Sequence, residues 1–206
     1  MAAGIVLCGG KSIRMGQPKA DLPFGRETLL ERVVGRLAAA VSPVVVVAAP
    51  DQSLPEFATE VLVVRDERTG AGPLEGLRRG LDAVQAVADF AFVTSCDAPF
   101  VSAAFVARML SQVQAHDAAV PVDRSGDSEF YFPLAAVYRT NLGAVIGRML
   151  DAGEFRVTQL FSHVSTRRVD LNELREVDPE LASLVNVNHP AEYQAALQRE
   201  AFRSND

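Results

Sequence analysis

The first loop of the chain is Leu7-Cys8-Gly9-Gly10-Lys11-Ser12-Ile13-Arg14-Met15-Gly16-Gln17-Pro18-Lys19. It follows directly on the short apolar run Ala2-Ala3-Gly4-Ile5-Val6, which predicts a buried strand. Glycine lets a backbone approach a ligand closely and adopt positive φ, and the three basic side chains of the loop supply charge for a polyanion. The stretch therefore predicts a strand that leads into a phosphate-binding loop. The alternative is a glycine-rich turn with incidental surface charge.

Two well-known phosphate loops do not match this stretch. A P-loop has four residues between its first glycine and the Gly-Lys-Ser, whereas Ile5 to Gly9 make five between Gly4 and Gly10. A dinucleotide fingerprint needs G-x-G-x-x-G spacing. Because Gly9 and Gly10 are adjacent, that pattern fails as well.

The rest of the chain predicts strands that alternate with helices. Apolar runs typical of strands cover residues 43–48, 61–64, 90–94 and 118–121, with further strand material at 130–138 and 166–169. Between them, apolar residues recur at helical spacing, and Thr28 with Glu31 and Ser102 stand where they can cap two of the helices. We expect a three-layer α/β/α fold with a Rossmann-like, mostly parallel sheet, in which the changed order near 130–138 adds one antiparallel strand.

Composition narrows the class of protein. At 206 residues, 49% of them hydrophobic, the chain is expected to form a single domain over residues 1–206. The formal net charge of −6 argues against nucleic-acid binding, which needs a basic surface. Cys8 and Cys96 are interpreted as small hydrophobic residues, and their scarcity suits a reducing compartment. No signal peptide or membrane span is predicted, so we expect a cytoplasmic protein that does not bind membranes.

Two aspartates follow predicted strands. Asp97 lies in Ser95-Cys96-Asp97-Ala98-Pro99 after the strand 90–94, and Asp66 comes shortly after the strand 61–64. Open α/β sheets bind ligands at the carboxyl ends of their strands, so Asp97 is placed to hold a metal ion. In a protein that binds a nucleotide, Asp66 is a candidate contact to the base or ribose. Aspartate is also typical of turns that end strands, and the local sequence leaves that second interpretation open.

Several motifs together resemble one family. The first loop, read as Leu-Cys-Gly-Gly-x-Ser-x-Arg-Met-Gly-x-x-Lys, is similar to the signature of the nucleotidyltransferases that handle molybdenum cofactor, closest to the guanylyltransferase (MobA) type. The stretches Gly72-Pro73-Leu74-Glu75-Gly76 and Cys96-Asp97-Ala98-Pro99 resemble further motifs of that family, as do Gly153-Glu154-Phe155-Arg156-Val157 and Val185-Asn186-Val187-Asn188-His189-Pro190. The likeness extends over nearly the whole chain.

The resemblance implies a fold similar to the nucleotide-diphospho-sugar transferases and a Mg²⁺-dependent enzyme. Members of the family transfer GMP from GTP to the terminal phosphate of molybdopterin and release pyrophosphate. Carried over residue by residue, the resemblance implies that the nucleotide is bound by Leu7, Cys8, Gly9, Gly10, Lys19, Asp66 and Asp97. The implied catalytic residues are Arg14, Lys19 and Asp97, and Asp97 is also the implied metal ligand. The implied acceptor-binding residues are Arg156, Asn186 and Asn188. Expected partners besides the substrates are proteins that supply the cofactor or receive it.

The chemistry that the resemblance implies suits the residue types present. Nucleotidyl transfer brings two anions together, so the protein must mainly position them and neutralise charge. Arg14 and Lys19 would offset the charge of the departing pyrophosphate, while Lys11 either assists or is solvated. A phosphate nucleophile needs no general base, which is consistent with three histidines that stand in no convincing triad.

Three positions depart from the family pattern. Ala48 stands where the family often has Asn, Ala98 replaces the usual Thr, and Phe132 stands where many members have His. An unmatched buried polar group is costly, so these changes bear most on the choice of base and acceptor. The alternatives are a cytidylyltransferase or a sugar-1-phosphate nucleotidyltransferase on the same scaffold, or a nucleotide-binding regulator without turnover.

Overall fold

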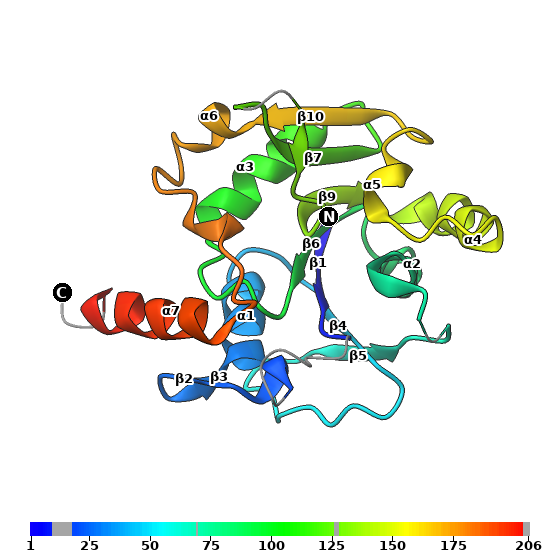
Figure 1. The fold of residues 1–206 in the computed structure, drawn as a ribbon. Helices are drawn as coiled ribbons and strands as arrows, with labels where there is room; N and C mark the ends of the chain where they lie inside the picture. The colour runs from blue at the N-terminus through cyan, green and yellow to red at the C-terminus, as the bar shows by residue number, and fades with distance from the viewer. Residues whose placement is uncertain (10–17, 69, 126–127, 204–206) are drawn as a thin grey trace.

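A computed structural model describes residues 1–9, 18–68, 70–125 and 128–203. Within these ranges, eight strands form one sheet with the order β10-β7-β9-β6-β1-β4-β5, and the short β8 pairs with β7 (Figure 1). The strands are β1 (Ala2–Leu7), β4 (Val44–Ala48), β5 (Leu62–Arg65), β6 (Phe90–Ser95), β7 (Ala118–Asp123), β8 (Phe130–Tyr131), β9 (Ala135–Arg139) and β10 (Thr166–Asp170). A separate hairpin consists of β2 (Pro23–Phe24) and β3 (Glu27–Thr28).

The sheet is mostly parallel, as the sequence predicts. β9 runs antiparallel to both of its neighbours, β6 and β7, while the other pairs along the strand order are parallel. The predicted strand material at 130–138 is divided, because β8 pairs antiparallel with β7 while β9 lies between β6 and β7. The carboxyl ends of the parallel strands therefore meet at one edge, which is where α/β sheets bind ligands.

Helices cover both faces of the sheet, which confirms the three-layer prediction (Figure 1). One face carries α2 (Gly72–Val84), α4 (Gly143–Asp151) and the short α5 (Val157–Leu160). The other carries α1 (Leu29–Ala38), α3 (Ala103–Val113) and the short α6 (Leu171–Leu174). Side chains alternate between the two cores along β1: Ile5 and Leu7 pack towards α2, and Val6 packs towards α1.

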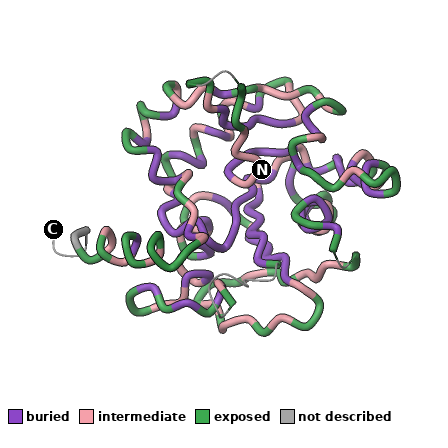
Figure 2. The backbone as a smooth tube through the Cα atoms, in the orientation of Figure 1, coloured by how far each residue is buried: buried purple, intermediate pink, exposed green. Residues whose placement is uncertain are grey.

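Local sequence signals explain where the helices begin. Thr28 caps α1 in a full capping box with Glu31, and the Ser102 hydroxyl accepts a hydrogen bond from the Phe105 amide at the start of α3. A 3₁₀ turn, Thr140–Leu142, precedes α4, which begins at Gly143. Every residue of β4 is buried, whereas Leu62 and Val63 of the edge strand β5 are partly exposed (Figure 2).

A third apolar cluster packs the last helix, α7 (Pro190–Arg203), near the β2–β3 hairpin and the start of α1. Its buried members are Leu22, Phe24, Leu29, Phe100, Ala182, Val187 and Ala196, and Tyr193 and Leu197 of α7 pack against them. The Tyr193 hydroxyl donates a hydrogen bond to the Pro23 carbonyl, and Arg32 of α1 pairs with Glu200. This packing places residues 185–189, which precede α7, beside Lys19. None of the described helices is long and apolar enough to cross a membrane.

Candidate active site

The site is centred on Lys19, which begins the 3₁₀ turn η2 (Lys19–Asp21) after the first loop. Its Nζ lies 2.6 Å from Oδ2 of Asp97, although 78 positions separate the two residues. Both side chains are largely buried, with 17% and 11% of their surface exposed. The ammonium and the carboxylate are therefore held together in a sheltered environment, at the edge where the strands end.

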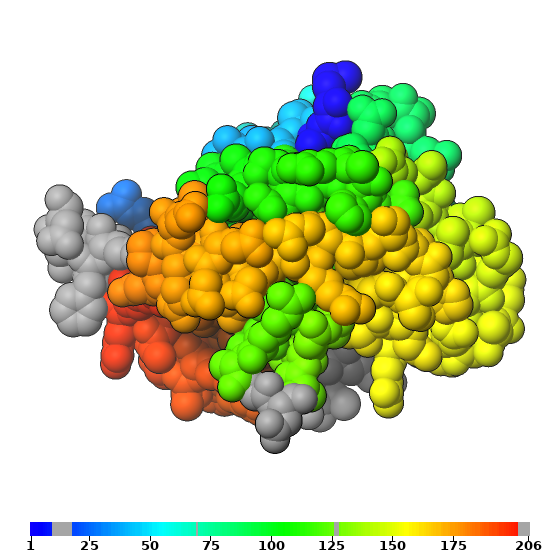
Figure 3. Space-filling view, turned by 90° about the horizontal axis from the view of Figure 1, so that it is seen from above, coloured from blue at the N-terminus to red at the C-terminus, as the bar shows by residue number. Residues whose placement is uncertain are grey.

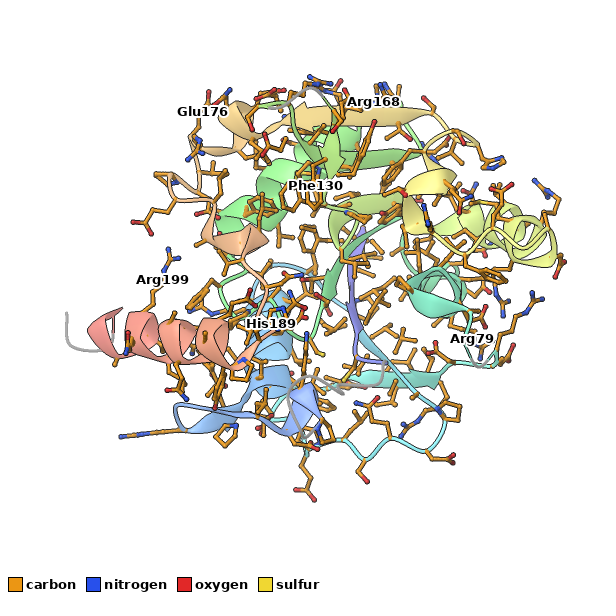
Figure 4. All side chains as sticks on the ribbon, viewed as in Figure 1. Arg79, Phe130, Arg168, Glu176, His189 and Arg199 are labelled. Atoms are coloured by element: carbon orange, nitrogen blue, oxygen red, sulfur yellow. The ribbon has the colours of Figure 1, made fainter. Side chains whose placement is uncertain are left out.

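Asn188 completes this cluster from the far end of the chain. Its Oδ1 accepts a second hydrogen bond from Lys19 Nζ at 2.9 Å. The Val187 amide donates to the Asp97 carbonyl at 2.8 Å, so the segment is also fixed through its backbone. Glu192 in the first turn of α7 accepts from the amides of Asn188 and His189, the latter labelled in Figure 4. Three distant segments thus meet at one ammonium group.

Ser95 orients the carboxylate of Asp97. It is the last residue of β6, and its hydroxyl donates to Asp97 Oδ1 at 2.5 Å while Lys19 contacts Oδ2. Asp97 itself is 8% exposed. Sequence reasoning missed Ser95, although a hydroxyl two residues before the key aspartate at a strand end is a usable signal.

Asp66 lies in a second part of the site, between two glycines. A Cβ placed on Gly9 would stand 2.8 Å from Oδ2 of Asp66, and one on Gly76 of α2 would stand 3.5 Å from Oδ1. A side chain at position 9 would therefore collide with this carboxylate, whereas one at position 76 would make an ordinary contact with it. Among the described residues, no donor reaches the buried Oδ1. Burial raises the pKa of Asp66, and the nearby Glu75 adds to the rise while Arg79, labelled in Figure 4, opposes it.

The loop after β4 supplies a side-chain amide that the sequence did not single out. Gln52 Oε1 accepts from the Ala49 amide at 3.2 Å, and its Nε2 lies 3.1 Å from the sulfur of Cys8. Arg65 holds the same loop by donating to the carbonyls of Ala49 and Gln52 at 2.8 and 2.6 Å. An amide therefore lies near Ala48, where the family pattern has Asn, but it comes from an irregular loop that no periodic pattern predicts.

Cys8 and Cys96 meet beside these groups. Both are free and buried, and both belong to the cluster on the α1 and α3 face. The neighbouring Cys96 thiol lowers the pKa of the Cys8 thiol despite its burial, and the Cys8 thiol together with burial raises the pKa of Cys96. Leu7, the residue before Cys8, is buried in the core on the α2 side.

The remaining predicted residues are not all joined to this cluster. Arg156 is the exposed N-cap residue of α5, and its neighbour Phe155 lies beside Gly72 at the start of α2. Asn186 is half-buried in the segment that carries Asn188. No hydrogen bond among the described residues links Arg156 to Lys19, Asp97 or Asn188. Gly10, Lys11 and Arg14 lie outside the described residues.

The donor chemistry of the site is compatible with a hard divalent cation. Asp97 offers carboxylate oxygens, and Mg²⁺ commonly binds through one or two carboxylates together with substrate phosphates and water. Within the described ranges, no three or more His, Cys, Asp or Glu side chains gather into a metal-binding group. A cation here would thus depend largely on phosphate oxygens brought by a substrate.

The chain matches a known family and curated relatives along most of its length. Residues 4–169 match the family described as the MobA-like NTP transferase domain. A Mycobacterium avium protein named probable molybdenum cofactor guanylyltransferase is 38% identical over 202 residues, which cover 97% of this chain and 96% of that protein. A Mycobacterium tuberculosis (strain H37Rv) protein of the same name is 38% identical over 199 residues, covering 95% and 93%.

Solved structures share the fold. The molybdopterin-guanine dinucleotide biosynthesis protein A of Archaeoglobus fulgidus superposes with a TM-score of 0.78 at 21% identity, covering 98% of this chain and 99% of its own. The 2-C-methyl-D-erythritol 4-phosphate cytidylyltransferase of Thermus thermophilus superposes with a TM-score of 0.72 at 21% identity, covering 96% and 98%. The sheet and its helices are therefore a nucleotidyltransferase fold, as the sequence resemblance implies.

Proposed function

The chain belongs to the MobA-like NTP transferase family, and from this premise we propose that it transfers GMP from GTP to the terminal phosphate of molybdopterin. The products are pyrophosphate and the guanine dinucleotide form of the cofactor. The chain is a nucleotidyltransferase, and the names of its curated relatives support this choice of substrates. We further propose that residues 1–206 act as one domain in the cytoplasm, with partner proteins that supply the cofactor or receive it.

One observation carries the proposal: Lys19, Asp97 and Asn188 converge from three distant segments. In the family pattern, these positions belong to the nucleotide, the metal and the acceptor respectively. A transfer reaction needs these three components in one place, because an acceptor phosphate must reach the α-phosphorus while charge is neutralised. A protein that only bound nucleotide would not need the third segment there.

The proposed roles follow from the chemistry of each group. We propose that Lys19 acts as a point charge for the phosphates, that Leu7, Cys8, Gly9 and Gly10 bind the triphosphate through the backbone, and that Arg14 offsets its charge. Asp97, oriented by Ser95, would hold Mg²⁺, which neutralises phosphate charge when bound. Arg156, Asn186 and Asn188 are proposed to bind the pterin phosphate. The acceptor oxygen forms the new bond to the α-phosphorus as the bond to pyrophosphate breaks, without a general base.

The choice of guanine rests on Asp66. Its buried Oδ1 is an acceptor without a donor among the described residues, and guanine presents N–H donors on its base-pairing edge. Cytosine and uracil offer fewer donors there. The family's Asn is replaced by Ala48 in this chain, so Asp66 carries more of the discrimination.

The test combines binding with turnover. In a thermal-shift panel of GTP, CTP, UTP and ATP with Mg²⁺, GTP should stabilise the protein most, because a ligand at about 100 times its Kd adds about 2.7 kcal/mol. Pyrophosphate release from GTP with molybdopterin should fall at least about a hundredfold in Lys19→Ala and Asp97→Asn. Asp151→Asn, which changes a carboxylate 68% exposed at the end of α4, is the matched control. A preference for CTP, or full turnover in both site variants, would refute the proposal.

A further inference from the structure

Cys8 and Cys96 directly follow two neighbouring strands, β1 and β6. β1 and β6 are parallel, their register runs to the pair Leu7 and Ser95, and the Cys96 amide donates to the Leu7 carbonyl at 3.0 Å. The next pair along this ladder is Cys8 and Cys96. Neighbouring strands lie about 4.8 Å apart, and disulfides join residues whose Cα atoms are about 4.4–6.8 Å apart. The backbone spacing therefore permits a bond between the two sulfurs.

The two side chains also point to the same side of the sheet. Both belong to the buried cluster on the α1 and α3 face. The Cys8 sulfur also receives the Gln52 amide at 3.1 Å. Two neighbouring free thiols can react with each other once one of them is oxidised, which an ordinary core residue cannot do.

We propose that Cys8 and Cys96 are an oxidisable dithiol, which a hydroperoxide closes to a disulfide and a cellular dithiol reopens. Its effect on turnover rests on the proposed function, whereas the bond itself does not. Disulfides in reducing compartments are mostly transient and redox-sensing, which is the behaviour expected here.

The step is balanced with hydrogen peroxide as the oxidant. The Cys8 sulfur attacks one peroxide oxygen, the O–O bond breaks, and Cys8 sulfenic acid and water form. The Cys96 sulfur then attacks the Cys8 sulfur and displaces the sulfenic oxygen, which leaves as a second water with the proton from Cys96. Two thiols are oxidised by two electrons and one peroxide is reduced. Exchange with an external dithiol reverses the bond.

Closure would disturb both halves of the site. Cys8 precedes Gly9, which lies against Asp66, and Cys96 precedes Asp97, which holds Lys19. A disulfide fixes the two sulfurs about 2.05 Å apart, which would move the Cys8 sulfur that the Gln52 amide contacts. Since misplacement by about 1 Å can cost about a hundredfold in rate, we expect oxidation to lower turnover by at least about tenfold.

The test begins with the full chain and measures the bond separately from activity. Wild-type protein, Cys8→Ser and Cys96→Ser are treated with stoichiometric hydrogen peroxide, and each is compared with its own reduced sample. In wild type we expect intact mass to fall by two hydrogen atoms, a peptide pair joining Cys8 to Cys96, and recovery with dithiothreitol. Neither serine variant should give the joined peptides. Bound GTP with Mg²⁺ should slow closure in wild type, because it covers Cys8.

Two results would overturn the proposal. One is a treated wild-type protein in which both thiols still react with an alkylating agent after unfolding. The other is a disulfide-containing protein whose GTP-induced thermal shift and pyrophosphate release match those of its reduced sample. Formation of the joined peptides in a protein that never transfers GMP would instead leave the dithiol in place and refute only the proposed function.

Discussion

At the scale of single residues, the site contains groups that favour function over stability. The Asp66 carboxylate lies between Gly9 and Gly76, and no donor among the described residues forms a hydrogen bond with its buried Oδ1. An unsatisfied buried acceptor is costly, and such groups concentrate at functional sites. A ligand that donates to Asp66 would relieve the cost. The carboxylate therefore marks where a substrate group is expected to bind.

Asp66→Asn should stabilise the ligand-free protein at neutral pH. Burial raises the pKa of Asp66 in the folded state, so folding takes up a proton between the unfolded and folded pKa values. Above the pKa of Asp66 in the folded state, its ionised carboxylate lowers the free energy of unfolding by the full amount. This loss of stability disappears as the pH falls below the pKa of Asp66 in the unfolded chain. Thermal melts from pH 7 downward should show a gain in Tm for the variant that shrinks with acidity. A gain in Tm that does not change with pH would contradict this account. In a separate measurement, GTP should raise the Tm of the variant less than that of wild type.

At the scale of elements, close packing between α2 and β1 sets the position of the second motif. A Cβ on Gly80 would stand 2.6 Å from Ile5, which is closer than real Cβ contacts. Gly76, one turn earlier in the helix, faces Leu7 of β1 and Asp66. Gly80 and Gly76 are therefore the residues that let this helix lie close to the strands.

Gly80→Ala should lower the free energy of unfolding by about 1–3 kcal/mol, since Ile5 has to shift in a packed core. Gly35→Ala in α1 is the matched control, because no atom lies within 4 Å of its added Cβ. Alanine is the better helix former, so the control should be more stable by about 0.5–1 kcal/mol. Urea titrations measure both changes. Equal effects at the two positions would show that α2 and β1 are not packed this tightly.

Sequence reasoning recovered the elements whose signals are local. The capping box at Thr28 and Glu31 and the buried run of β4 follow from capping residues and the pattern of apolar residues. The partners of Asp97 and Cys8 were beyond its reach, because Ser95 and Gln52 act through contacts that only the folded chain creates. The resemblance indicated that Lys19 and Asn188 are functional, but their direct contact across 169 positions required the structure.

At the scale of the whole molecule, the site is formed by segments that lie near the beginning and the end of the sequence. α7 docks on the β2–β3 hairpin and carries Asn188 to Lys19 (Figure 1). Seen from above, β10 and the projecting segment that contains β8 lie at the front of the molecule (Figure 3). Phe130 of β8 is largely exposed. The position of the acceptor segment thus depends on packing of the third cluster.

Phe24→Ala tests this dependence. Phe24 is 1% exposed and meets Phe100 edge-on at 6.0 Å, so its truncation should cost about 3–5 kcal/mol. Hydrogen exchange should accelerate in residues 185–200, and the KM for molybdopterin should rise more than that for GTP. Phe130→Ala, at a side chain 64% exposed, is the control and should cost about 1 kcal/mol or less. If hydrogen exchange near Asn188 is unchanged in Phe24→Ala, the position of Asn188 does not depend on the packing of α7 against the hairpin.

The most direct test of the central claim is mass detection of the product. Purified protein is incubated with GTP, Mg²⁺ and molybdopterin, and the small molecules are analysed by mass spectrometry. We expect the pterin to gain the mass of one GMP unit with equimolar pyrophosphate, and no such adduct with the Lys19→Ala protein. Wild-type protein that binds GTP but yields no GMP–pterin adduct would contradict the account.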